Sequence, residues 1–252
     1  MTYDTIILGA TYLAAGIAEE LQESCLIVER RPQAGYEFIN ALRFGPGYGE
    51  KLVSDKAKDL FKKFEEKGAF HGERICLFDC ASCLYQMLEN KNVLLNTEIV
   101  SVTKNGEGFC VQIHGVSGYR TFYAKQVIDT RVLPDMIHSK TLNLLINSKN
   151  HPSRILPYAS EAKYGYPGDV LIKIPVRADA GYAEARKTVK QFLENMPAGY
   201  KATLVADCFD WAVKQSYPKI KDGVYYLPSA RFLGPLSAFD AGVLFARGGD
   251  AE

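Results

Sequence analysis

The 252-residue sequence predicts an α/β protein that opens with a Rossmann-like unit. Three observations lead to this fold class. A strand, a helix and a second strand follow one another within about thirty residues at the start, the length of a βαβ unit. Alternating segments with turn residues between them occupy the middle of the chain. One more buried strand then returns at Gln126 to Asp129.

The first unit can be read residue by residue. Thr5 to Leu8 is a short apolar run, as in a buried parallel strand, and it stops at Gly9. The following segment has apolar residues every four positions, which is typical of an amphipathic helix, at Leu13, Ile17 and Leu21. Cys25 to Val28 is the second apolar run. Its crossover must be right-handed for the helix to pack on the sheet.

The later elements follow from periodicity and turn signals. Asn105-Gly106 and the stretch 115–118 separate alternating segments, so an antiparallel meander is expected there. Trp211 is expected on a surface helix. Helices are predicted over 54–67, 81–89, 182–195 and 237–247, and strands over 93–95, 98–104, 109–114, 120–124, 126–129, 170–176 and 224–227.

Composition excludes several classes of protein. Thirty basic and 29 acidic side chains give a net charge of +1 without a basic block, so no nucleic-acid partner is predicted. No apolar stretch approaches the roughly 18 residues that span a bilayer, and no signal peptide is visible. We therefore predict a cytoplasmic protein with no membrane partner. The sequence leaves the oligomeric state open.

The junction after the first strand carries the clearest chemical signal. Gly9, Thr11 and Ala14 stand at the three positions of a dinucleotide-binding turn, and Glu29 follows at the end of the second strand. In that motif the glycines allow a tight turn and close approach to a pyrophosphate at the helix N-terminus, and the acid binds ribose hydroxyls. An ordinary βαβ unit with a glycine at its turn gives the same pattern.

The order of the later segments resembles the FAD-dependent oxidoreductases among the glutathione-reductase-like flavoproteins. Residues 93–124 look like that family's strand and meander, 127–130 like its second motif, and 224–247 like its closing strand, loop and helix. The resemblance implies a Rossmann-like FAD/NAD(P)-binding domain with an antiparallel β-meander and a smaller inserted α+β lobe. The domain would comprise 1–45, 75–150 and 220–252, and the cap or substrate lobe 46–74 and 151–219.

The resemblance also implies a cofactor and its binding residues. FAD is the predicted cofactor, and a small molecule is the predicted substrate of an oxidoreductase. Four residues of the first unit would face the ADP half, Val100 would lie by the adenine, and the loop 229–236 would lie near the flavin and ribityl chain. The full set of predicted cofactor-binding residues is Gly9, Thr11, Tyr12, Ala14, Glu29, Arg30, Val100, Thr130, Ser229 and Leu236.

Three departures from the family pattern leave a second hypothesis open. Thr11 replaces the glycine nearest the phosphates, Arg131 stands where the second motif carries glycine, and Pro228-Ser229 replaces a glycine followed by an acid. Each change removes a feature that the cofactor uses. The alternative function is therefore a non-catalytic protein of the same fold that binds FAD weakly or not at all.

The cysteines and the aromatic residues allow further interpretations. Cys76, Cys80 and Cys83 have the spacing of an iron–sulfur loop or a redox dithiol, but their place at a mid-chain helix favours buried structural thiols without metal. The four histidines show no metal-ligand spacing, so no metal site is predicted. Aromatic residues of the second lobe could line a substrate site or simply pack, namely Tyr158, Tyr164 and Tyr166, with Arg154 beside them.

Overall fold

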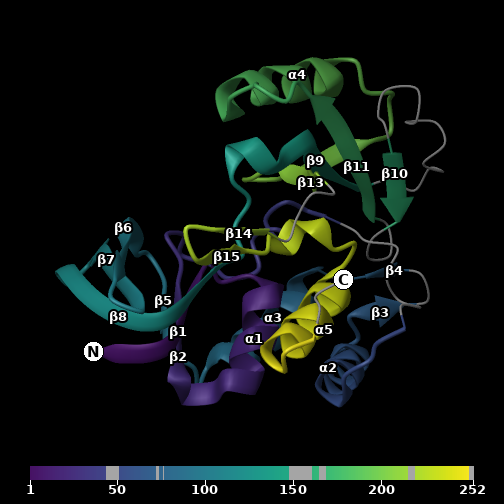
Figure 1. The fold of residues 1–252 in the computed structure, drawn as a ribbon. Helices are drawn as coiled ribbons and strands as arrows, with labels where there is room; N and C mark the ends of the chain where they lie inside the picture. The colour runs from purple at the N-terminus through teal and green to yellow at the C-terminus, as the bar shows by residue number, and fades with distance from the viewer. Residues whose placement is uncertain are drawn as a thin grey trace.

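The computed structural model describes residues 1–43, 51–71, 74–75, 77–147, 161–164, 169–214 and 219–249. Two large sheets form two layers of the molecule (Figure 1). The first contains eight strands, carries the N-terminal βαβ unit and is accompanied by helices α1, α3 and α5. The second contains five strands and lies beside helix α4.

The first sheet has the order β14-β15-β8-β1-β2-β5, with the β6–β7 hairpin attached to β8. Its neighbours from β15 to β5 are parallel, and only β14 and the hairpin run antiparallel. The strands are β1 (Thr2–Leu8), β2 (Cys25–Val28), β5 (Val93–Leu94), β6 (Glu98–Asn105), β7 (Gly108–Gly115), β8 (Gly118–Asp129), β14 (Lys219–Lys221) and β15 (Val224–Tyr226).

The predicted meander and the predicted return strand are joined. Residues 120–124 and 126–129 belong to one twelve-residue strand, β8, whose first half pairs with β7 and whose second half pairs with β1. No turn residue separates Ala124 from Gln126, so nothing in the sequence interrupts the strand. The meander is thereby fixed rigidly to the parallel sheet.

The second sheet has the order β10-β11-β9-β12, and β13 also pairs with β9. The prediction of a surface helix at Trp211 is wrong, because Trp211 lies in β13 and pairs with Lys140. Its aromatic ring packs edge-on against Tyr36 and Phe209. The strands are β9 (Ile137–Asn147), β10 (Glu161–Tyr164), β11 (Asp169–Val176), β12 (Lys201–Val205) and β13 (Asp210–Val213).

Five α-helices and several shorter elements complete the described chain. Helix α3 begins four residues earlier than predicted. The α-helices are α1 (Tyr12–Leu21), α2 (Asp55–Glu66), α3 (Leu77–Leu88), α4 (Tyr182–Glu194) and α5 (Pro235–Ala246). The short elements are the 3-10 helices Gln22–Ser24, Pro134–Met136 and Ser229–Arg231 and the two-stranded pair β3 (Phe70–His71) and β4 (Arg74–Ile75).

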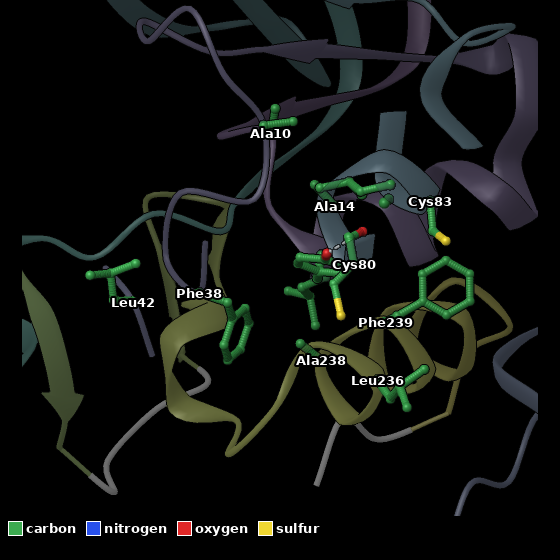
Figure 2. Close-up of a cluster of buried hydrophobic side chains, with 14 of the residues drawn as sticks. Ala10, Ala14, Phe38, Leu42, Cys80, Cys83, Leu236, Ala238 and Phe239 are labelled. Carbon is green, nitrogen blue, oxygen red and sulfur yellow. Dashed lines mark hydrogen bonds between the residues drawn. The ribbon is translucent and has the colours of Figure 1, made fainter. Parts of the chain in front are cut away.

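Helices α1 and α5 cross with their backbones in contact. A Cβ atom on Gly16 would lie 2.1 Å from the carbonyl oxygen of Phe239, and one on Gly242 would lie 2.2 Å from that of Leu13. Only glycine permits this approach. Figure 2 shows Ala14 of α1, Cys80 of α3 and Phe239 of α5 in the same buried cluster. The crossing holds the N-terminal turn of α1 next to the C-terminal segment.

One buried cluster includes side chains of both sheets, from Ile7 in β1 to Leu144 in β9. Helix α2, in the segment predicted for the cap lobe, packs against α3 and α5 of the first layer. The division into two domains stays a prediction. Among the described residues, no helix combines the length and apolar character needed to cross a membrane.

Candidate functional site

The candidate site is the turn between β1 and α1, at the carboxyl end of the parallel strands. Gly9 has a φ of 100°, a left-handed conformation that favours glycine. A Cβ atom there would lie 2.7 Å from Cγ of Arg131 and 3.0 Å from Oγ1 of Thr130. The turn is therefore tight and is covered on one side by the residues that follow β8.

Thr11 is the N-cap of α1. Its hydroxyl accepts a hydrogen bond from the backbone N–H of Ala14 (3.1 Å) and donates one to Oγ1 of Thr130 (2.9 Å). Capping of this kind satisfies one of the free donors at a helix start. The side chain is thus held against Thr130, and it is buried.

Glu29 lies at the end of β2, as the motif predicts, and its carboxylate accepts two backbone hydrogen bonds. Oε2 accepts the N–H of Ala10 (3.0 Å), and Oε1 accepts the N–H of Arg31 (2.8 Å). Only 2% of the residue is exposed. Burial raises the pKa of Glu29, and the two backbone hydrogen bonds oppose that rise.

The side chain of a second buried acid, Glu37, lies against the N-terminal end of α1. Its Oε1 accepts the backbone N–H of Tyr12 (2.8 Å) and the hydroxyl of Ser229 (2.8 Å). Its other oxygen, Oε2, is buried without a hydrogen-bond partner. The residue is 2% exposed, and this burial raises its pKa from 4.5 to about 7.

Ser229 connects the C-terminal segment to the same helix end. Its Oγ lies 3.4 Å from the backbone N of Leu13, and its own N–H donates to the carbonyl of Thr130 (2.9 Å). The turn and the first residues of α1 thus have four N–H groups with acceptors from this chain. They are the N–H groups of Ala10, Tyr12, Leu13 and Ala14.

Arg131 pairs with Asp129 beside the glycine turn. The guanidinium makes a bidentate contact, with Nε at 2.9 Å from Oδ1 and Nη2 at 2.8 Å from Oδ2. Asp129 also accepts the backbone N–H of Arg131. The planar guanidinium suits this two-point pairing, and it keeps the side chain of Arg131 along Gly9.

The remaining predicted residues divide into two groups. The phenol of Tyr12, at the start of α1, donates to the carbonyl of Cys80 (2.9 Å), and Leu236 is buried at the start of α5. Arg30 and Val100 are exposed, and the structure brings neither into contact with that site. Val100 sits at a β-bulge of β6.

Other residues of the segment that carries Glu37, among them Asn40, line a cleft of about 260 Å³. Three large apolar side chains at its edge are strongly exposed, Phe78 (59%), Tyr85 (41%) and Leu204 (40%). The Asn40 amide nitrogen donates to Asp207 Oδ2 (3.0 Å) and to Gln33, while its Oδ1 is buried without a partner. The cleft therefore combines apolar surface with hydrogen-bond acceptors.

None of the cysteines in the described residues forms a disulfide. Cys80 and Cys83 are buried on α3, while Cys76 lies outside the described residues. Burial raises the pKa of Cys25 to about 11 and that of Cys208 to about 12. In the part of the chain that the structure describes, no group of His, Cys, Asp and Glu could hold a metal ion. Arg154, Tyr158 and Tyr166 also fall outside that part.

No family model and no curated protein matches the sequence. Solved structures do match the fold. The p-nitrophenol 4-monooxygenase PnpA from Pseudomonas putida DLL-E4 is 11% identical with a TM-score of 0.59, over 98% of this chain and 78% of that one. BexE, studied for oxidation during BE-7585A biosynthesis, is 14% identical with a TM-score of 0.64, over 98% and 63%. The anhydrotetracycline hydroxylase OxyS from Streptomyces rimosus is 13% identical with a TM-score of 0.62, over 98% and 61%.

The architecture is a flavoprotein fold. The predicted α/β fold class is confirmed at this level. The glutathione-reductase-like branch and the inserted lobe stay predictions. The chain spans about three fifths of BexE and OxyS, with 63% and 61% of their lengths covered.

The described residues do not fit a diphosphate at the helix end. A dinucleotide of this fold class places its pyrophosphate at the helix N-terminus, where backbone N–H groups point at it. Here those N–H groups have acceptors, and Gly9, Thr11, Glu29 and Glu37 are all buried. A diphosphate could bind there only if Glu37 were displaced.

Sequence reasoning missed Glu37. It lies in the Gly- and aromatic-rich segment after β2, which has no regular periodicity, and an acid in such a segment is exposed in most proteins. The available signal is the four-residue stretch Gln33 to Tyr36 before it, because a short connection with a glycine can return to the strand ends. Gly35 does so, since its N–H donates to the carbonyl of Ala10 (2.7 Å).

Proposed function

We propose that this chain is a non-catalytic protein of the flavoprotein fold that binds FAD weakly or not at all. One observation carries the proposal, namely the buried carboxylate of Glu37 against the N–H of Tyr12 and the hydroxyl of Ser229. A diphosphate at the same helix end would have to displace this side chain, and it would be repelled by the ionised form of Glu37.

A small molecule is the partner that the remaining surface supports. The cleft beside Asn40 and Asp207 offers apolar side chains and hydrogen-bond acceptors, the combination by which proteins orient small ligands. A ligand with an apolar ring would pack against the exposed side chains of Phe78, Tyr85 and Leu204 at the edge of the cleft. The predicted cytoplasmic location stays a prediction.

A second candidate function is an FAD-dependent oxidoreductase acting on a small molecule. The left-handed Gly9 and the acid Glu29 at the end of β2 favour it, together with the likeness to hydroxylases and a monooxygenase. FAD would supply hydride or electron transfer when bound. Under this alternative, Glu37 leaves the helix end when the cofactor enters.

The absorbance spectrum of the protein purified without added cofactor separates the two functions. The proposed function predicts no flavin band and no flavin in the supernatant after denaturation. Stoichiometric flavin would contradict it and favour the oxidoreductase. A sample purified with FAD in all buffers and then desalted is the control for loss during handling.

A further inference from the structure

The cleft lined by Asn40 is built from three parts of the chain. Helix α3 contributes the rings of Phe78 and Tyr85, β12 contributes Leu204, and the segment 33–43 contributes Asn40. Its volume of about 260 Å³ lies just below the range of about 300–1,000 Å³ in which proteins hold drug-sized ligands. The cleft therefore suits a small ligand with one or two rings.

Asp207 is the only charged residue among the described residues that line the cleft. It follows β12 and is exposed. Within the part of the chain that the structure describes, its carboxylate forms no ion pair. The cation Arg31, two residues before the segment 33–43, stacks on the ring of Tyr36 and is not among the lining residues. The cleft thus carries a negative charge that no described residue neutralises.

Asn40 holds Asp207 in place at two points. The amide nitrogen Nδ2 of Asn40 donates to Oδ2 of Asp207 (3.0 Å), and the backbone N–H of Asp207 donates to the carbonyl of Asn40 (3.2 Å). Oδ1 of Asp207 accepts no hydrogen bond from the described residues. Because a side chain that is already held loses less conformational entropy on binding, this carboxylate is prepared to receive a ligand through Oδ1.

We infer that the cleft binds a small organic cation in which an ammonium group is attached to an aromatic ring system. The ammonium pairs with the carboxylate of Asp207, and the ring packs on the apolar side chains at the edge. The exposed rings of Phe78 and Tyr85 favour the same charge, because the face of an aromatic ring attracts cations. This inference rests on the small-molecule cleft of the proposed function and adds the ligand class.

Isothermal titration calorimetry of the full chain with a matched series of ligands tests the ligand class. Tryptamine is a cation at neutral pH, tryptophol is its neutral alcohol counterpart, and indole-3-propionate is an anion. Tryptamine should bind about threefold to tenfold more tightly than tryptophol, as expected for one partly exposed ion pair, and indole-3-propionate should bind most weakly. Added salt at about 1 M should reduce these differences, because the Debye length falls to about 3 Å.

Three variants assign the preference to Asp207. Asp207→Asn keeps the shape of the side chain and removes its charge, so tryptamine should bind to it only as tightly as tryptophol does. Asp207→Glu keeps the charge and should retain a preference for tryptamine. Asp222→Asn is the matched control, because Asp222 is another exposed acid, in the β14–β15 turn, and is not among the lining residues. This control should leave all three affinities unchanged.

Several outcomes would overturn the inference. They are equal affinities of wild type for the three ligands, no binding of any of them, and a tryptamine preference that persists in Asp207→Asn. The comparison of ligands on wild type needs no variant, so it decides even if a variant does not fold. Flavin in the purified wild type contradicts the proposed function, and the same titrations still decide the ligand class. Flavin-free wild type without a preference for tryptamine contradicts this inference alone.

Discussion

The two faces of the segment 33–43 differ in how much open volume they border. Toward α1, Glu37 is buried and its Oε1 takes two hydrogen bonds, so the start of α1 is filled by a side chain. Toward the second sheet, Asn40 lines a cleft of about 260 Å³. The helix start at which a dinucleotide fold receives a diphosphate is thus occupied, while the same segment borders an open volume. A fold fixes where a site can be, and the side chains decide whether it is available.

The largest change in stability is expected when the residues of the family pattern are restored at positions 11 and 229, at the start of α1. Ser229→Asp with Thr11→Gly would place a second carboxylate within hydrogen-bond distance of Glu37, in a position with no solvent exposure. Two buried carboxylates cannot both ionise, so we expect the free energy of unfolding to fall by about 3 kcal/mol or more.

Urea unfolding measures this change, with Ser229→Ala as the matched control that removes the hydroxyl without adding charge. The loss should be much smaller in Ser229→Ala. A stable double variant that gains FAD affinity would show that Ser229 and Thr11 face an open cofactor position.

The next effect concerns the pH dependence of stability at Glu37. The pKa of Glu37 is raised from 4.5 to about 7 in the folded protein. Its contribution to the free energy of unfolding is therefore fully present below pH 4.5 and is lost as the pH rises through about 7. Glu37→Gln cannot titrate. The stability of wild type relative to this variant should therefore fall between these values, by at most about 3 kcal/mol.

Denaturant titrations at several pH values test this expectation, and the comparison of the two proteins cancels the titration of Glu29. A constant difference between wild type and Glu37→Gln across this range would contradict the buried position of the carboxylate.

A smaller effect is expected at the pair beside Gly9. Arg131→Ala leaves the buried carboxylate of Asp129 with only a backbone donor, and we expect a loss of about 2 kcal/mol because Arg131 itself is partly exposed. Arg177→Ala, which breaks an exposed pair with Asp179, is the matched control and should have no measurable effect. Equal thermal shifts in the two variants would refute the structural role of the Arg131 pair.

The smallest effect on stability is expected at the open face. Leu204→Asp adds a charge to an exposed apolar side chain at the edge of the cleft, and stability should change by less than about 0.5 kcal/mol. Binding of an apolar fluorescent dye should nevertheless decrease, while Glu37→Gln should bind the dye as wild type does. Unchanged fluorescence in Leu204→Asp would show that the cleft does not take apolar ligands.

Much of the fold could be predicted because it depends on local patterns. The βαβ unit was visible in apolar runs broken at Gly9, and Glu29 lies at the end of β2 as the motif requires. The strand boundaries around Ala124 and the state of Trp211 were missed, since both are set by pairing with distant strands, β1 and β9. Local propensity does not contain those partners.

The candidate site could be predicted only in part. The three departures at Thr11, Arg131 and Ser229 pointed to an altered cofactor position, but not to the reason for it. Thr11 caps α1 and contacts Thr130, and Ser229 donates to Glu37, so both serve internal hydrogen bonds. Glu37 comes from an irregular segment whose path depends on tertiary contacts, and the short glycine-containing stretch 33–36 before it is the one signal in the sequence that it returns to the strand ends.

Calorimetric titration of FAD into the wild-type protein at neutral pH tests the central claim most directly. If Glu37 closes the start of α1, the titration should give no binding tighter than about 100 μM, and Glu37→Ala should bind more tightly than wild type. Wild-type binding of one FAD per chain with a dissociation constant of about 1 μM or below would contradict the claim that Glu37 closes the start of α1.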